Sequence, residues 1–294
     1  MSCFKLIGVS YQNLEHPFIY PRVSISDTFR HITERVGIQF QDMLTHISEG
    51  ETLEIKEHFL CSTIITSCFA TGDITWPQVR TYFKQNGSHH SPTILLNAYE
   101  CASWGYALRY CFKKHPSIRY VMVSICDVNV YNLEHWVYNP LWGHSGFGCT
   151  TMLIEREGEG DISTELVTGG IQHYNLMIGF ASVVRKAIAT RDKCAISLPF
   201  FPKPIRNMLE RALNQYTILA NGHEQWGHCF GSDPWISILN HSLKNSATSN
   251  INYLACSLAL NGYYSLLEIE VTPKTVFLLH ENIPRRERRI GNSQ

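Results

Sequence analysis

Short apolar runs alternate along the chain with segments in which apolar residues recur every three or four positions. These are the patterns of buried strands and amphipathic helices. Residues 93–96 form an apolar run that is too short for a buried helix, so we predict a strand there. After a break, helical spacing begins, with Trp104, Ala107, Leu108 and Cys111 on one face. Cys101 therefore lies at a predicted strand-to-helix junction.

The same patterns predict the other elements. Further strands are predicted at 4–10, 59–69, 119–128, 216–220 and 234–239, and helices at 26–46, 74–85, 175–190 and 204–215. Residues 251–260 and 263–271 form an apolar pair around Asn261-Gly262, the strongest hairpin signal in the chain. Because a strand at 119–128 completes a strand–helix–strand unit, we predict that 93–96 and 119–125 are parallel neighbours in one sheet.

Turns and loops are predicted where this periodicity stops. Gly143, Gly146 and Gly148 precede an apolar run, and glycines in that position indicate a turn packed closely against another loop. Residues 17–22 contain two prolines, and residues 240–250 are polar, so both stretches are predicted to be loops.

A boundary between two halves is predicted at 156–161, where the sequence is charged and contains glycine. The halves would span 1–157 and 158–294. A chain of 294 residues is long enough for one large domain or for two closely packed halves.

Charge and cysteine content restrict the classes of function. The chain has 25 Lys plus Arg and 25 Asp plus Glu, so no net positive charge favours nucleic-acid binding, and the basic stretch 285–289 is predicted to be a solvated tail. No apolar run is long enough to span a membrane, and the first twelve residues lack the pattern of a signal peptide. Ten cysteines without an export signal favour reduced thiols in a cytoplasm. No CxxC or HxxxH pair occurs, so we predict no metal site.

Cys101 is the first candidate for chemistry. At a helix N-terminus, free backbone N–H groups and the helix dipole favour the thiolate, which is the nucleophilic form of cysteine. The alternative is structural, because buried cysteines mostly fill space as small hydrophobic residues. Small neighbours, Ala102 and Ser103, and the strand-to-helix position distinguish Cys101 from the other cysteines.

Four stretches follow one another in an order that is known from one enzyme family. The first is ECASWGYALRY at 100–110, followed by RYVMVSICDV at 119–128. The others are WGHSGFGCTTMLIE at 142–155, YTILANGHEQ at 216–225 and the hairpin at 251–271. Together they resemble the nucleophile segment, the glycine-containing turn, the histidine loop and the closing hairpin of the ketoacyl-acyl-carrier-protein synthase III family.

This resemblance implies an α/β, thiolase-like fold in which two βαβ-rich halves stack as layers of helix, sheet, helix, sheet and helix. It implies that Cys101 is the residue that becomes acylated and that His223 is the first catalytic histidine, with His228 close enough to compete. Asn245 matches the third member of the site, although Leu243 and Lys244 replace the histidine and glycine that precede this asparagine in the family.

The activity implied is that of an acyltransferase or condensing enzyme of fatty-acid, polyketide-type or secondary metabolism. Such an enzyme takes an acyl group from a coenzyme A or carrier-protein thioester onto Cys101 and passes it to an acceptor. The thioester is a co-substrate, and no permanently bound cofactor is implied. Decarboxylative condensation needs both a histidine and an asparagine as donors, whereas transfer to an alcohol or amine needs chiefly a base.

Two alternatives to an enzyme remain. A short, divergent member of the family can be a non-catalytic subunit that pairs with an active homologue. A binding module would keep an acyl or coenzyme A pocket beside an unreactive Cys101. The resemblance also implies a dimer, with a second copy or with a longer homologue, because the nucleophile-bearing strand and helix lie near a two-fold interface in this fold. An acyl carrier protein is a further implied partner.

Overall fold

The computed structural model describes residues 3–14, 24–47, 53–86, 91–131, 133–158, 161–172, 175–191, 193–245 and 248–280. The loop predicted at 17–22 and the tail predicted at 285–289 lie outside these residues. Within them, no helix is both long enough and apolar enough to cross a membrane.

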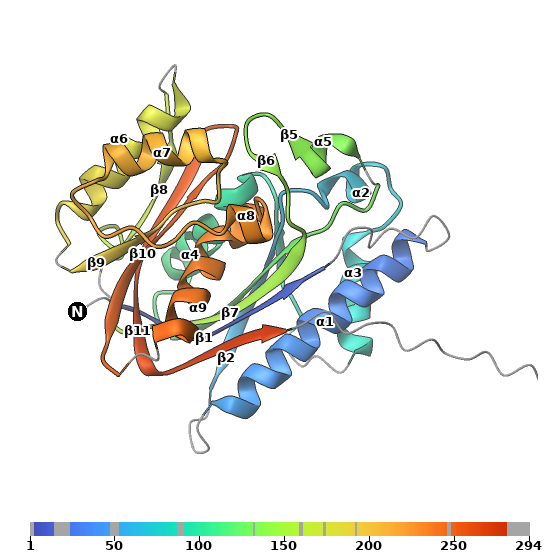
Figure 1. The fold of residues 1–294 in the computed structure, drawn as a ribbon. Coiled ribbons are helices and arrows are strands. Elements are labelled where there is room, and N and C mark those ends of the chain that lie inside the picture. The colour runs from blue at the N-terminus through green and yellow to red at the C-terminus, as the bar shows by residue number, and fades with distance from the viewer. Residues whose placement is uncertain are drawn as a thin grey trace, which may run out of the picture.

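The described strands form one nine-stranded mixed sheet and one small two-stranded sheet (Figure 1). The large sheet runs in the order β3-β2-β4-β7-β1-β11-β10-β9, and β8 pairs with β11. Its strands are β1 (Phe4–Asn13), β2 (Ile55–Cys61), β3 (Ile94–Leu96), β4 (Tyr120–Asp127), β7 (Gly148–Arg156), β8 (Leu166–Gly170), β9 (Cys194–Ser197), β10 (Ile251–Leu258) and β11 (Tyr263–His280). The small sheet pairs β5 (Tyr138–Asn139) with β6 (Gly143–His144).

Helices lie in the middle of the molecule and on its outer sides. They are α1 (Ile25–His46), α2 (Thr66–Ala70), α3 (Trp76–Gln85), α4 (Ser103–Lys114), α5 (Glu134–Val137), α6 (Leu176–Ile188), α7 (Lys203–Ala212), α8 (His223–Trp226) and α9 (Asp233–Asn245), with short 3₁₀ turns η1 (Glu100–Ala102) and η2 (Phe230–Ser232). Figure 1 shows α4 and α9 in the middle of the molecule, with α6 and α7 on one outer side and α1 and α3 on another. Trp104 of α4 meets Trp235 of α9 edge to face, with ring centroids 5.0 Å apart.

The hydrophobic core extends across both predicted halves. One cluster of buried side chains includes Phe4 and Ile154 from the first half together with Tyr253 and Ile269 from the second. In addition, β1 pairs in parallel with β11, so the first and last of the described strands are neighbours in the sheet. One core thus contains residues of both halves, and the division into 1–157 and 158–294 stays a prediction.

The predicted pairing of 93–96 with 119–125 is wrong, because β2 lies between β3 and β4. Phe59 of β2 pairs with Ile94 on one side and with Val123 on the other, and both pairings are parallel. The two strands are therefore parallel members of one sheet but are not neighbours. Consecutive strands pair only in about two thirds of cases, and adjacency along the chain could not reveal that an earlier strand is inserted.

The strand predicted at 59–69 ends early, at Cys61. The N–H of Ser62 still donates to the carbonyl oxygen of Leu96 in β3, but those of Thr63 and Ile64 donate to the Asp127 carboxylate. Once a side chain takes these donors, the strand cannot continue its ladder of backbone hydrogen bonds. The strand predicted at 216–220 is likewise reduced to an isolated bridge between Ile196 and Ile218.

The strand predicted at 234–239 and the loop predicted at 240–250 are both wrong, because α9 occupies most of this stretch. Every residue from Asp233 to Leu239 is buried, so the segment shows no amphipathic period that would indicate a helix. Pro234 also suggests a break, but proline is well tolerated in the first turn of a helix.

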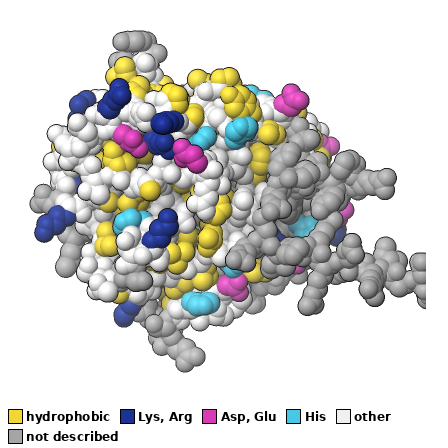
Figure 2. All heavy atoms as spheres, in the orientation of Figure 1, with side chains coloured by type: hydrophobic (Ala, Val, Ile, Leu, Met, Phe, Trp, Pro, Cys, Tyr) yellow, Lys and Arg dark blue, Asp and Glu magenta, His cyan; other side chains and the backbone are white. Residues whose placement is uncertain are grey.

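Side chains of all kinds are interspersed on the face drawn in Figure 2, where cationic and acidic groups lie close to one another. On the protein surface, Arg206 and Glu224 form an ion pair, with the Arg206 Nη1 2.9 Å from the Glu224 Oε1. The described part of this face shows no extended patch of a single charge, which agrees with the equal numbers of acidic and basic residues.

Candidate active site

Cys101 lies at the junction between β3 and α4, as the change of pattern predicts, and the backbone beside it is strained. It belongs to η1, and α4 begins two residues later. The preceding residue, Glu100, has a φ of 46°, a left-handed conformation that is costly for a residue with a side chain. Its carboxylate accepts a hydrogen bond from the backbone N–H of Leu260, at the turn between β10 and β11 (3.1 Å). The closing hairpin therefore holds the junction that carries Cys101.

A second chain segment packs directly against this junction. A Cβ at Gly231 of η2 would lie 3.1 Å from the carbonyl oxygen of Cys101, so the two short turns are in close contact. Phe230, the first residue of η2, has a φ of 55° and packs with Cys101 in a small apolar cluster. Because α9 starts immediately after η2, the N-termini of α4 and α9 meet at Cys101.

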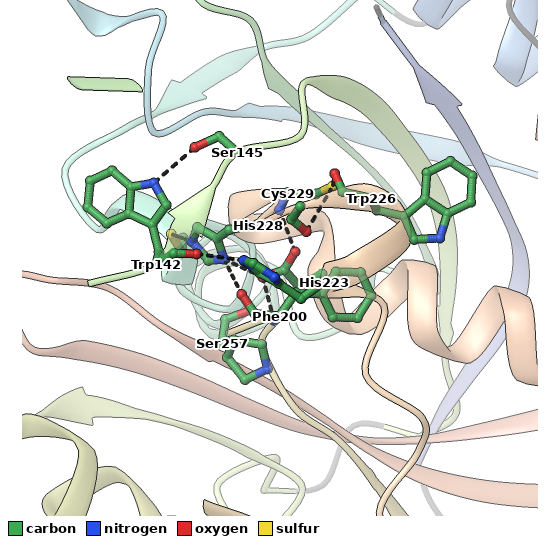
Figure 3. Close-up of polar contacts among 12 residues, drawn as sticks. Trp142, Ser145, Phe200, His223, Trp226, His228, Cys229 and Ser257 are labelled. Carbon is green, nitrogen blue, oxygen red and sulfur yellow. Dashed lines mark hydrogen bonds and ion pairs between the residues drawn. The ribbon is translucent and has the colours of Figure 1, made fainter. Parts of the chain in front are cut away.

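His228 faces Cys101 and is backed by Asp233. Its Nε2 lies 3.9 Å from the Cys101 Sγ. Its Nδ1 lies 2.7 Å from Oδ2 of Asp233. The same nitrogen lies 3.0 Å from the carbonyl oxygen of Phe200 (Figure 3). All three side chains are buried, with Asp233 entirely inaccessible. Cysteine, histidine and aspartate thus form a line in the order that nucleophilic catalysis by cysteine requires.

The partners of His228 determine its tautomer. A carboxylate and a carbonyl oxygen can only accept hydrogen bonds, so the Nδ1 between them must carry the proton. In the neutral imidazole, Nε2 is then left with its lone pair directed at the Cys101 sulfur. This is the arrangement of a general base beside a thiol.

Asp233 is held rigidly by backbone donors as well as by His228. Its Oδ1 accepts from the N–H of Cys229 at 2.6 Å, and its Oδ2 accepts from the N–H of Phe200 at 2.8 Å. The imidazole itself stacks on Phe201, with ring centroids 5.6 Å apart and planes 13° apart. The ring plane and the direction of Nε2 are therefore fixed before any substrate binds.

Two hydrogen bonds join the backbone of His228 to the glycine-containing turn at 143–148. The N–H of His228 donates to the carbonyl oxygen of His144 (2.8 Å), and the N–H of Gly146 donates to the carbonyl oxygen of His228 (2.9 Å). Gly227 has a φ of 71°, and a Cβ there would lie 2.8 Å from backbone atoms of this turn. The predicted close approach of the turn at 143–148 to another loop is confirmed, and that loop carries His228.

The structure does not bring His223 and Asn245 to the sulfur. The Nε2 of His223 is hydrogen-bonded to the carbonyl oxygen of Trp142 (2.8 Å; Figure 3). No contact among the described residues joins His223 to Cys101. Asn245 is the last residue of α9, where its amide donates to the carbonyl oxygen of His241 (2.7 Å). Asp233 begins this helix, so at ~1.5 Å per residue Asn245 lies about 18 Å away along the axis.

The environment of Cys101 opposes the thiolate that its helix position predicts. Burial raises the pKa of Cys101 well above its ordinary value, and the negative charges of Asp127 and Asp233 raise it further. Thr63 acts in the opposite direction through a hydrogen bond from its hydroxyl to the sulfur. The resting site therefore holds a neutral thiol, and its proton must be removed by His228 during the reaction.

Sequence reasoning missed the two buried aspartates. Asp233 precedes a proline in a stretch without amphipathic period, and Asp127 lies at the end of the strand predicted at 119–128, so neither position stands out as part of a site. The one available signal was the spacing of His228 and Asp233, which is short enough for a local contact. Within the described residues, no group of three or more His, Cys, Asp or Glu side chains is arranged to hold a metal ion.

No protein-family model matches the chain, and no curated protein matches it at the level of sequence. Solved structures do match the chain at the level of the fold. A 3-oxoacyl-(acyl-carrier protein) synthase from Burkholderia xenovorans has a TM-score of 0.65 at 9% identity, over 95% of this chain and 97% of that one. The 3-oxoacyl-(acyl carrier protein) synthase III of Pseudomonas aeruginosa has a TM-score of 0.60 at 11% identity, over 92% and 98%. The ishigamide ketosynthase/chain length factor has a TM-score of 0.53 at 12% identity, over 74% of each chain.

These similarities show the fold. The chain has the thiolase-like α/β fold of ketoacyl-acyl-carrier-protein synthase III and related condensing enzymes, which confirms the predicted fold class and the resemblance.

Proposed function

We propose that this protein is an acyltransferase that takes an acyl group from a thioester onto Cys101 and transfers it to an acceptor. In this proposal His228 is the general base and Asp233 orients it. The observation that carries the proposal is the line of contacts from the Cys101 Sγ to His228 and on to Asp233, on a fold shared with condensing enzymes.

The first half-reaction needs only these residues. His228 Nε2 removes the thiol proton of Cys101 as the sulfur attacks the carbonyl carbon of the thioester. The carbon–sulfur bond to coenzyme A or to a carrier protein then breaks, and His228 returns the proton to the departing thiolate. The products are acyl-Cys101 and a free thiol. The buried Asp233 carboxylate stabilises the imidazolium that exists between these steps.

The second half-reaction distinguishes simple transfer from condensation. In transfer, His228 takes the proton of an alcohol or amine that attacks acyl-Cys101, and the cysteine leaves as a thiolate that recovers the proton. Condensation requires two donors on the enolate oxygen of a malonyl thioester. Asn245 lies at the far end of α9 and the Nε2 of His223 is bonded to Trp142, so the predicted pair is not assembled. We therefore favour an alcohol or amine acceptor.

Intact-mass analysis with acyl-coenzyme A donors of graded chain length tests this proposal. Wild type should gain the mass of one acyl group, and Cys101→Ser should gain none that is released by hydroxylamine at neutral pH. His228→Ala should acylate at least 100-fold more slowly, within the range typical for loss of a general base. The matched control is His223→Ala, in the same loop region, which should acylate within a few-fold of wild type. Loss of acylation in His223→Ala with retention in His228→Ala would contradict the assignment.

A non-catalytic subunit is the second candidate, and one observation favours it. Cys101 is only 6% exposed, and its surroundings raise the pKa of its thiol. If wild type gains no acyl mass from either coenzyme A or carrier-protein donors, this second function is favoured. The protein should then copurify with an active ketosynthase III-like homologue whose activity falls when this chain is removed.

A further inference from the structure

Two polar groups, and not His228 alone, contact the Cys101 sulfur. The hydroxyl of Thr63 donates to the Cys101 Sγ at 3.8 Å, while His228 Nε2 lies 3.9 Å from the same atom. Thr63 comes from the loop between β2 and α2, and His228 comes from the loop before η2. The sulfur therefore has a hydrogen-bond donor and a proton acceptor supplied by two different loops.

A buried carboxylate fixes the loop that carries Thr63. The Oδ1 of Asp127, at the end of β4, accepts from the N–H of Thr63 (2.6 Å), the hydroxyl of Ser62 (3.0 Å) and the N–H of Ile64 (3.2 Å). Asp127 is 1% exposed, and within the described part of the chain its Oδ2 has no hydrogen-bond partner. Three donors on one buried oxygen leave the loop little freedom, so the Thr63 hydroxyl is positioned before substrate binds.

We propose that Thr63 is a catalytic residue whose hydroxyl stabilises the Cys101 thiolate, and that Asp127 is a positioning residue that acts through Thr63. This inference rests on the proposed role of Cys101 as a nucleophile. The charged groups that affect the sulfur are Asp127, Asp233 and Glu100, and all three oppose a negative charge on it. Among the side chains that affect the pKa of Cys101, the Thr63 hydroxyl is the one that favours that charge.

The proposed hydrogen bond acts at both chemical steps. When the thiol proton moves to His228, the electron pair left on sulfur accepts the Thr63 hydroxyl more strongly than the neutral thiol does. In acyl-Cys101 the thioester sulfur is a poor acceptor, so the bond weakens. When the acceptor attacks and the carbon–sulfur bond breaks, the electron pair returns to sulfur and the bond re-forms. Thr63 therefore favours both formation of the nucleophile and departure of the cysteine.

The test compares Thr63→Val, which keeps the shape and removes the hydroxyl, with Thr63→Ser, which keeps the hydroxyl. The readout is the rate at which iodoacetamide alkylates Cys101 across a range of pH, with Cys101→Ser used to subtract the other cysteines. A single hydrogen bond to the thiolate predicts an alkylation rate about fivefold lower at neutral pH for Thr63→Val, with the titration moved to higher pH. Thr63→Ser should remain within about twofold of wild type. Ultraviolet absorbance of the thiolate should show the same order of titration midpoints.

The role of Asp127 is tested by a double-mutant cycle. If Asp127 acts through Thr63, the fivefold effect of Thr63→Val should shrink to nearly none in an Asp127→Ala background. A full fivefold effect in both backgrounds would show that Asp127 does not position Thr63. Circular dichroism establishes that each variant is folded, and the Thr63 comparison stands alone if Asp127→Ala does not fold.

The outcomes separate this inference from the proposed function. Equal rates for wild type, Thr63→Val and Thr63→Ser would overturn the role of Thr63, even if the protein forms an acyl-enzyme. Equal losses in both Thr63 variants would also overturn it, because the hydroxyl would not be responsible. Conversely, if alkylation follows Thr63 as expected but no thioester donor acylates Cys101, the thiolate site stands and the proposed acyl transfer fails.

Discussion

The carboxylate of Asp233 lies 2.7 Å from Nδ1 of His228 and is completely buried. Together with the Phe200 carbonyl oxygen, this carboxylate fixes the proton on Nδ1 and leaves the lone pair of Nε2 facing Cys101. Asp233 and the Phe200 carbonyl therefore set the tautomer of His228 together.

Asp233→Asn tests this relationship. Asparagine removes the negative charge that stabilises the imidazolium formed when His228 takes the thiol proton, while the Phe200 carbonyl oxygen still accepts from Nδ1. We expect acylation of Cys101 to slow by about 100-fold or more, measured as single-turnover acyl-enzyme formation, with substrate binding little changed. Ser237→Ala, in the same helix, should behave as wild type. An Asp233→Asn protein that is folded and acylates at the wild-type rate would contradict the oriented-base assignment.

Gly146→Ala should damage the histidine loop. A Cβ at Gly146 would lie 2.0 Å from the carbonyl oxygen of Trp226 and 2.6 Å from the Cys229 sulfur, so the loop that carries His228 must shift. We expect a loss of about 1–3 kcal/mol in the free energy of unfolding, together with slower acylation. Gly37→Ala is the control, because a Cβ there meets nothing within 4 Å and alanine favours the helix. Chemical denaturation measures the free energy of unfolding of both variants. Equal values for the two would argue against close packing of Gly146 on the loop that carries His228.

Asp127 should make the stability of the protein depend on pH. Burial raises the pKa of Asp127 from 3.8 to about 6. The folded protein holds this proton more tightly than the unfolded chain, so Asp127 contributes stability that is fully present below pH ~4 and is lost as the pH rises to ~6. We expect wild type to lose about 3 kcal/mol more than Asp127→Asn over this interval. Urea denaturation at a series of pH values measures the difference, and parallel curves for the two proteins would refute it.

We expect the protein to form a dimer through β3 and α4. Among the described strands β3 is an edge of the large sheet, so it offers unpaired backbone groups to a second copy. It borders a groove of about 830 Å³ lined by Ile94, Leu95, Leu96, Tyr99, Tyr106, Arg109, Tyr110, Lys113 and Lys114. Light scattering should give a dimer mass at micromolar concentration, and Leu95→Lys should give a monomer. A monomeric wild type that dimerises only with a longer homologue would point to the heterodimer.

The sequence by itself determined those features that depend on neighbouring residues. The change from a short apolar run to helical spacing placed Cys101 between β3 and α4, and Asn261-Gly262 placed the turn between β10 and β11. The glycines at 143–148 indicated a close approach to another loop, which the contact of Gly146 with Trp226 confirms. Each of these patterns reflects a local backbone requirement, which is why a single stretch of sequence is enough to reveal it.

Only the tertiary structure decided which groups meet the Cys101 sulfur. Thr63 is 38 positions away and reaches the sulfur because β2 is inserted between β3 and β4. His228 is 127 positions away and reaches it because η2 packs against the turn that carries Cys101. The sequence also concealed α9, because a helix buried on all sides has no polar face to show its period. Without knowledge of this helix, the sequence could not show that Asp233 and Asn245 lie at its opposite ends. Local periodicity determines the elements, whereas contacts between distant residues depend on how those elements pack.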